Sequence, residues 1–291
     1  MSRRARRALE LVLVYAAVAV VLLVVLIPYG WMVSGSFKTT LELQSADVTR
    51  PGLEPTWIPR SPTLENYLNV NNTVPMLRYF KNSLIISTGT MVVSTFLALL
   101  AAFALSRFQF PGKGPYVVSV LATQVLPGIL FLIPYFAMFL WVDRTWGIRL
   151  QNTYHGMIFT YTSFSLPFAI VMLRSYIDSI PREIDEQARI DGCSHLGVLF
   201  RMVLPLSAPS IAAVGIYAFI MAWNELLFAS VLTGTDTRTV AVGLLEYITT
   251  QQARWGGMMA ASVVVSIPVM ILFTLIQRQI VEGLVAGATK G

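Results

Sequence analysis

The sequence predicts an all-α polytopic membrane protein with six transmembrane helices and a charged cytoplasmic helix between the fourth and fifth spans. Only 12% of its 291 residues are charged and 55% are hydrophobic, whereas soluble domains carry about 25% charged residues. Apolar runs recur along the chain, and a bilayer core requires about 20 mostly apolar residues per helix. These observations place the chain in the membrane class.

Six segments have the length and composition of membrane spans. They are about Leu9–Val33, Asn82–Leu105, Tyr116–Val142, Met157–Tyr176, Ser207–Leu232 and Met258–Ile276. Prolines lie inside the third, fourth and sixth segments, and an internal proline removes a helical hydrogen bond. We expect kinks or local breaks there, which either serve packing or shape a cavity.

The predicted spans divide the chain into four parts. These are a basic segment with the first helix (1–34), an extracytoplasmic loop (35–81), a transmembrane core (82–278) and a cytoplasmic C-terminal tail (279–291). The arginines of Arg3–Arg7 precede the first span and place the N-terminus in the cytoplasm, and six spans return the C-terminus to that side. Because this cluster fits a membrane flank, the net charge of +6 does not indicate nucleic-acid binding. The apolar run Leu11–Ile27 exceeds the h-region of a signal peptide, so we expect an uncleaved helix.

The sequence shows no pattern for catalysis or metal binding. With one cysteine, Cys193, and two histidines, neither an internal disulfide nor a zinc site is indicated. The patterns G-x-S-x-G and H-E-x-x-H are absent, which argues against an intramembrane protease. The nearest fragment to a P-loop, Gly112-Lys113-Gly114, lacks the earlier glycine and is interpreted as a tight turn. We expect no catalytic residue and no cofactor bound by this chain.

The segment 181–205 interrupts the apolar pattern, because six of its first eleven residues are charged. Asp178 or Ser179 is expected to cap a first helix, whose first turn suits Pro181. Gly192 is placed to end this helix, because glycine adopts the left-handed conformation at little cost.

Side-chain spacing adds detail to this segment. Asp185 and Arg189 are spaced for an i,i+4 ion pair, and Ser194 is placed to cap a second helix that Pro205 closes. The apolar residues of the second helix recur on one face: Leu196, Leu199, Phe200, Val203 and Leu204. We interpret the segment as a helix–turn–helix lying against the membrane, although periodicity alone leaves a solvated connector open.

Four stretches of the chain resemble one family of transport proteins. Glu186–Gly192, followed by Leu204-Pro205, resembles the E-A-A-x-x-D-G…L-P motif of the permeases of binding-protein-dependent ABC importers, with Gln187 in place of the first alanine. The stretches ALSRFQFPGKGPY, AWNELLFASVLT and QRQIVEGLVAGATKG are similar to the carbohydrate-uptake branch, which includes the second membrane subunit of the maltose importer. The resemblance covers nearly the whole chain.

The resemblance implies an assembly and a function. The expected partners are a second permease subunit, two cytoplasmic ATPase subunits that hold ATP and Mg²⁺, and an extracytoplasmic binding protein. The expected function is translocation of a sugar or oligosaccharide by alternating access across a bacterial or archaeal cell membrane; glycerophosphate-type or other polyol cargo is the alternative. A self-sufficient secondary transporter would usually show internal repeats or several buried charges, and neither is evident.

The same resemblance assigns residues to roles. The coupling helix that docks on an ATPase would use Glu186, Ala188, Asp191 and Gly192. The tail that reaches between the ATPases would include Gly287, Lys290 and Gly291.

Contacts to cargo are expected inside the membrane. Glu225 is an acid in the predicted fifth span, where charge is costly, and it is either a lining or hinge group or a buried structural acid. Further candidates for the translocation path are Gln124, Tyr161, Thr162 and Asn224. The loop Thr233–Gly256 has an apolar centre and is either a re-entrant element facing the binding protein or a simple external loop.

Overall fold

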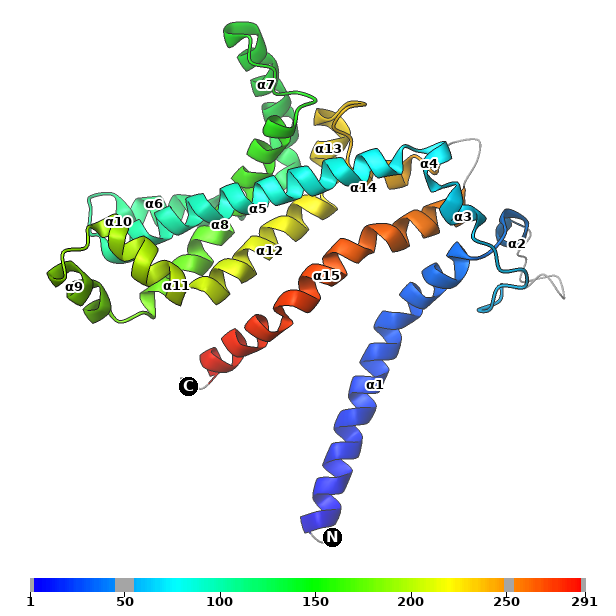
Figure 1. The fold of residues 1–291 in the computed structure, drawn as a ribbon, viewed down its shortest axis with the longest axis horizontal. Helices are drawn as coiled ribbons and strands as arrows, with labels where there is room; N and C mark the ends of the chain where they lie inside the picture. The colour runs from blue at the N-terminus through cyan, green and yellow to red at the C-terminus, as the bar shows by residue number, and fades with distance from the viewer. Residues whose placement is uncertain (1–2, 45–54, 249–253, 289–291) are drawn as a thin grey trace. The chain divides into compact units, whose positions relative to one another are not determined.

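The computed structural model describes residues 3–44, 55–248 and 254–288, and helices dominate this part of the chain (Figure 1). The all-α prediction is confirmed. Within the described residues, five helical segments are long and apolar enough to cross a membrane: Leu9–Ser36 of α1 (Arg3–Ser36), α5 (Met76–Arg107), Gly128–Trp146, α8 (Tyr154–Asp178) and Trp255–Leu275 of α15 (Trp255–Ala288). A sixth arises if His195–Leu206 and Ala208–Asn224, which meet at 82°, form one bent span.

The chain packs as two compact units. The first comprises Met1–Met76 and Leu244–Ile267, and the second comprises Leu77–Gly243 and Pro268–Gly291. Three short helices of the first unit, α2 (Thr40–Gln44), α3 (Glu65–Leu68) and α4 (Val70–Thr73), lie in the predicted extracytoplasmic loop.

The second unit is built on α5, α8 and α12 (Ala208–Asn224), which run alongside one another (Figure 1). Ala98, Ala102 and Ala169 are completely buried in one cluster that draws on these three helices. Small residues allow such close approach where lipid gives helices no hydrophobic drive to associate. A Cβ at Gly89 would lie 2.4 Å from Cδ1 of Ile158, so a larger residue there would displace the Ile158 side chain at the crossing of α5 and α8.

The predicted third span is two helices rather than one. The chain forms α6 (Lys113–Ala122), leaves the helical conformation, and resumes with the 3₁₀ turn η1 (Gly128–Phe131) and α7 (Leu132–Trp146). The expected break at Pro127 is therefore confirmed, whereas α8 and α15 continue through Pro167 and Pro268. Neighbouring groups can satisfy the carbonyl that a proline frees.

The predicted fifth span is also divided, which corrects the single helix expected from apolar content. α12 ends at Asn224 and α13 (Leu227–Leu232) begins after an extended residue, Glu225. A further short helix, α14 (Val240–Leu245), follows, with Val240 and Val242 buried.

Candidate functional site

The charged segment begins with α9 (Arg182–Ile190), and its start differs from the prediction. The N-cap is Pro181, without a side-chain cap, so the expected capping by Asp178 or Ser179 is wrong. Both residues belong to the end of α8, which runs on to Asp178 and takes Ser179 as its C-cap. Acidic residues still occupy the first turn of α9, where they complement the helix dipole.

The end of α9 confirms the predicted glycine stop. Gly192 has a φ of +89°, and its N–H donates to the carbonyl of Arg189 at 3.0 Å. The N–H of Cys193 donates to the carbonyl of Ala188 at 2.9 Å. Paired bonds of this kind around a left-handed residue form a Schellman motif, which fixes the direction in which the chain leaves the helix.

Residues of the family motif divide between the two faces of α9. Ala188 is 3% exposed and belongs to a buried cluster that includes Phe103 of α5 and Ile177 of α8. Glu186 and Asp191 are exposed. One face thus packs against α5 and α8, and the other leaves acidic groups exposed.

The expected pair of Asp185 with Arg189 is not formed. Oδ2 of Asp185 lies 2.5 Å from Nε of Arg107, the last residue of α5. Arg189 is exposed. Arg107, 78 positions upstream, thus takes the place of Arg189 as the partner of Asp185, because burial strengthens the attraction between the two charges. In the sequence, only the stretch ALSRF, which contains Arg107, could have suggested this arginine.

The second half of the segment is one helical run made of α10 (His195–Val198), a π-helical turn η2 (Leu199–Val203) and α11 (Leu204–Leu206). Ser194 caps it as predicted, accepting from the N–H of Gly197 at 3.1 Å. The predicted apolar face is only partly correct, because Leu196 and Phe200 are exposed. The π turn breaks the 3.6-residue period on which the predicted apolar face is based. The helix also runs to Leu206, so Pro205 does not close it as predicted.

A cavity of about 340 Å³ lies where the third and fifth predicted spans break. Its described lining residues are Thr123, Gln124, Leu126, Gly128, Ile129, Tyr161, Phe164, Met221, Ala222, Glu225, Leu227 and Phe228. Gln124, Tyr161 and Glu225, three of the predicted path residues, are thus brought together. The non-helical stretch 123–127 supplies one wall of the cavity through Thr123, Gln124 and Leu126.

Glu225 holds the break between α12 and α13 in place. Its Oε1 accepts from the N–H of Phe228 at 2.9 Å, and its Oε2 accepts from the N–H of Ala229 at 3.0 Å and from the Tyr161 hydroxyl at 2.8 Å. The carboxylate therefore caps α13, at the positive end of the helix dipole. Glu225 therefore has a structural role at the break, and its side chain also lines the cavity.

Aromatic rings form a wall beside this carboxylate. Phe164 and Phe228 line the cavity, with ring centroids 4.8 Å apart, and Tyr135 packs against both at 5.6 and 5.8 Å. The Tyr135 hydroxyl is bonded to Ser163. The interlocked rings hold each other in fixed orientations.

Two predicted path residues do not line the cavity. Thr162 is 7% exposed, and its hydroxyl has no hydrogen-bond partner among the described residues. Asn224 is exposed and donates to the carbonyl of Ile220 at 3.0 Å. Of the predicted tail residues, Gly287 falls within α15, so the helix extends further than expected, while Lys290 and Gly291 lie outside the described residues.

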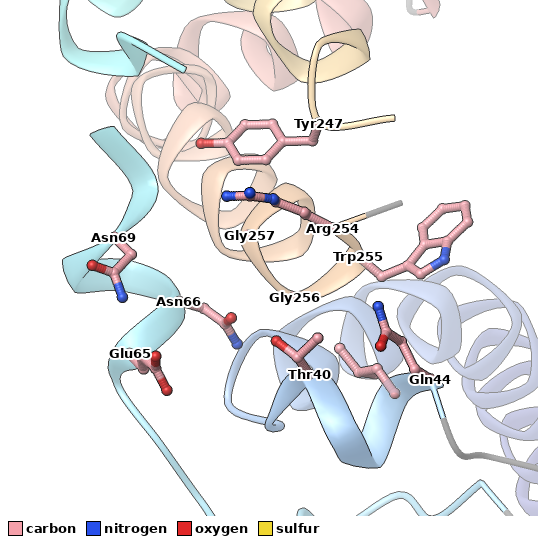
Figure 2. A pocket seen from close by; sticks show the side chains of 11 residues that line it. Thr40, Gln44, Glu65, Asn66, Asn69, Tyr247, Arg254, Trp255, Gly256 and Gly257 are labelled. Atoms are coloured by element: carbon pink, nitrogen blue, oxygen red, sulfur yellow. The ribbon is translucent and has the colours of Figure 1, made fainter. Parts of the chain in front are cut away.

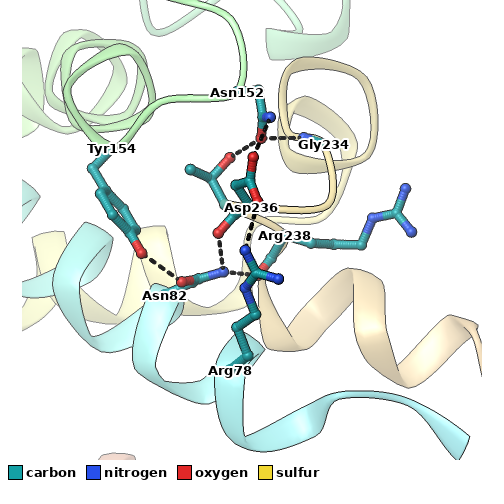
Figure 3. Close-up of polar contacts among 8 residues, drawn as sticks. Arg78, Asn82, Asn152, Tyr154, Gly234, Asp236 and Arg238 are labelled. Atoms are coloured by element: carbon teal, nitrogen blue, oxygen red, sulfur yellow. Dashed lines mark hydrogen bonds and ion pairs between the residues drawn. The ribbon is translucent and has the colours of Figure 1, made fainter.

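A polar network, not predicted from the sequence, fixes the loop before α14 (Figure 3). Asn82 donates to the carbonyls of Asp236 and Arg238, both at 2.9 Å, and accepts from the Tyr154 hydroxyl at 2.7 Å. Asn152 accepts from the N–H of Gly234 at 2.8 Å. Side-chain amides thus fix the loop before α14, and α14 itself buries Val240 and Val242 while Leu245 is exposed.

A second polar pocket lies in the first unit (Figure 2) and has a volume of about 600 Å³. Two of its lining side chains are hydrogen-bonded to backbone carbonyls. Asn66 donates to the carbonyls of Ser36 and Lys38 at 2.9 and 2.8 Å, and the Tyr247 hydroxyl donates to Val70 at 2.5 Å. Burial raises the pKa of Tyr247 to about 12. These hydrogen bonds join α3 to the end of α1 and Tyr247 to α4 within the first unit.

The fold and the α9 segment define a helical, multi-pass membrane protein of the permease class. The model of one family, the inner membrane component of binding-protein-dependent transport systems, matches residues 94–285. The chain belongs to this family and is therefore a permease subunit of an ABC importer.

Curated relatives and solved structures agree with this assignment. The chain is 37% identical over 289 residues to the inner membrane ABC transporter permease protein YcjP of Escherichia coli (strain K12), covering 98% of this chain and 99% of that protein. It is 35% identical to the trehalose/maltose permease MalG of Thermococcus litoralis (97% and 98% covered) and 33% identical to the diacetylchitobiose permease DasC of Streptomyces coelicolor (94% and 95% covered). A bacterial alginate importer shares the fold, with a TM-score of 0.75, 21% identity and coverage of 96% and 98%.

Proposed function

We propose that this chain is one of two permease subunits of an importer for an uncharged sugar or oligosaccharide. The cavity at the two helix breaks carries the proposal. Aromatic faces from Phe164 and Phe228 and neutral polar groups from Thr123 and Gln124 meet there, and such mixed lining suits small polar ligands with apolar faces. Relatives named for trehalose/maltose and diacetylchitobiose uptake support a sugar or oligosaccharide as cargo.

The charge of the cavity argues against glycerophosphate-type cargo. The described lining residues include no lysine, arginine or histidine, and the one acid among them is Glu225. Phosphate recognition in proteins relies on cationic donors. A carboxylate instead repels an anionic cargo, and the repulsion is strong where the dielectric constant is low.

The coupling to ATP belongs to the cytoplasmic side of the chain. Under this proposal both termini are cytoplasmic, the exposed acids Glu186 and Asp191 dock α9 on an ATPase subunit, and Gly287, Lys290 and Gly291 reach between the two ATPases. The chain itself performs no catalysis and holds no cofactor; ATP and Mg²⁺ are bound by its partners. Closure of the ATPases moves α9 and thereby switches the permease between inward-facing and outward-facing states.

Purification from native membranes tests the proposal. The affinity-tagged chain is isolated in mild detergent, its partners are identified by mass spectrometry, and the complex is reconstituted in proteoliposomes with its binding protein. We expect a second permease, an ATPase, and an uncharged saccharide released from the binding protein and accumulated on ATP addition. A phosphate ester as the released ligand would refute the cargo, and uptake by the chain alone on an ion gradient would refute the importer.

A further inference from the structure

We infer that Arg107, the last residue of α5, is a positioning residue that sets the angle of α9, so that movement of α9 is transmitted to α5 as well as along the chain to α8. The inference rests on the proposed coupling role of α9. It concerns residues outside the stretch Glu186–Gly192, since Asp185 precedes that stretch and Arg107 lies 78 positions before Asp185.

One guanidinium joins two separate parts of the segment. Nε of Arg107 lies 2.5 Å from Oδ2 of Asp185 on α9, and its Nη2 donates to the carbonyl of Ile180, in the link between α8 and α9, at 3.1 Å. The side chains of Arg107 and Asp185 are only 8% and 13% exposed. Water therefore competes little with this ion pair.

The neighbouring residue, Ser106, adds two contacts in the same place. Its hydroxyl donates to Oδ1 of Asp178 at 2.6 Å, and its carbonyl accepts from Nη2 of Arg182 at 3.1 Å. The end of α5 is thus bound to the end of α8, to the link and to the first turn of α9. These bonds lie beside the cluster that buries Ala188 and Ile180.

The chemistry explains why charge is used here. Apolar packing of Ala188 holds α9 against the bundle but allows it to slide or rotate, whereas a planar guanidinium with several donors fixes an orientation. Buried ion pairs contribute little net stability, but loss of one partner leaves an uncompensated buried charge. Such an ion pair suits a contact that has to keep the angle between α9 and α5 fixed while α9 moves.

Charge-removing and charge-exchanging variants test the inference in the reconstituted complex. The readouts are basal ATP hydrolysis, its stimulation by the loaded binding protein, and sugar taken up per ATP. We expect Arg107→Gln to assemble and hydrolyse ATP but to lose at least about tenfold in sugar per ATP, and the exchange Arg107→Asp with Asp185→Arg to recover part of it. Arg174→Gln is the matched control, because its i,i+4 pair with Asp178 is longer, 3.4 Å, and more exposed.

The outcomes separate this inference from the proposed function. If Arg107→Gln retains wild-type sugar per ATP while Glu186→Lys is uncoupled, the inference is wrong and the proposed function stands. If uptake and hydrolysis fall together at a constant ratio, Arg107 is merely structural. If Arg107→Gln does not assemble, Arg107→Lys is measured instead, because the lysine ammonium keeps the charge but lacks the planar, forked donors of the guanidinium. Reduced sugar per ATP in Arg107→Lys supports the inference, and an unchanged ratio overturns it. Coupling that survives Glu186→Lys would instead refute the proposed role of α9.

Discussion

The charged segment around α9 and the cavity at the helix breaks are built in opposite ways. In the segment, the glycine stop at Gly192 and the cap at Ser194 each act within a few residues of their own position. In the cavity, the lining comes from three distant stretches, and Glu225 is held by Tyr161, 64 positions away. The comparison shows that the ends of a docking element can be encoded locally, although its angle depends on the remote Arg107, while a translocation cavity depends on where helices are interrupted and on which remote groups stabilise the interruption.

The largest expected effect is at the exposed face of the charged segment. Glu186→Lys reverses a solvated charge and leaves the buried face of α9 intact, so the protein should remain folded in the membrane. We expect ATP-driven uptake to fall by about 100-fold or more, because a reversed charge at a docking surface replaces attraction with repulsion. Uptake in proteoliposomes and membrane content by immunoblot are the measurements.

Glu183→Lys provides the matched control for this variant. It makes the same charge change in the first turn of the same helix, at another exposed position. We expect a loss of only about 0.5 kcal/mol in helix stability from the dipole and nearly normal uptake. Equal loss of uptake in both variants would show that α9 responds to net charge rather than to contact at Glu186.

Sequence reasoning succeeds where the determinants are local. Apolar runs identify the spans. The turn predicted at Gly112-Lys113-Gly114 is only partly correct, because Gly112 has a φ of +86° but Lys113 and Gly114 already belong to α6. The same reasoning pairs Asp185 with the nearby Arg189, because the buried position of Arg107 beside α9 depends on tertiary packing. It also treats Ser207–Leu232 as one helix, because apolar content does not reveal that a carboxylate ends one helix and caps the next.

Glu225→Gln tests whether Glu225 stabilises the helix break or binds the cargo directly. A neutral amide keeps one acceptor for the N–H groups of α13 but loses the charge that complements the helix dipole. We expect about 2 kcal/mol lower stability, measured by thermal unfolding in detergent, and uptake reduced through a smaller folded fraction with KM unchanged. A raised KM at unchanged stability would instead make Glu225 a direct ligand of the cargo.

Gly192→Ala tests how far the segment depends on a single local signal. A Cβ at Gly192 would meet no atom within 4 Å, so its cost arises from the left-handed backbone alone. We expect about 1–2 kcal/mol of destabilisation and a comparable loss of coupling as the exit direction of α9 changes. Gly114→Ala is the control: its Cβ is equally unobstructed, but Gly114 lies within α6, so stability should stay constant or rise. Equal losses of stability in both variants would refute the role of the left-handed backbone at Gly192 in ending α9.

Thr162→Val has the smallest expected effect and tests the boundary of the cavity. The Thr162 hydroxyl is buried without a hydrogen-bond partner among the described residues, so its removal should leave stability unchanged or raise it by up to about 1 kcal/mol, with normal KM. Thr160→Val, two residues earlier in α8, is the matched control. The Thr160 hydroxyl donates to the carbonyl of Gly156 at 2.9 Å, and the loss of this bond should cost about 1 kcal/mol of stability. A raised KM in Thr162→Val would place this residue in the path after all. The cavity would then extend along α8 beyond Tyr161, and the distinction between a packed helix core and a cargo-facing wall would shift by one residue.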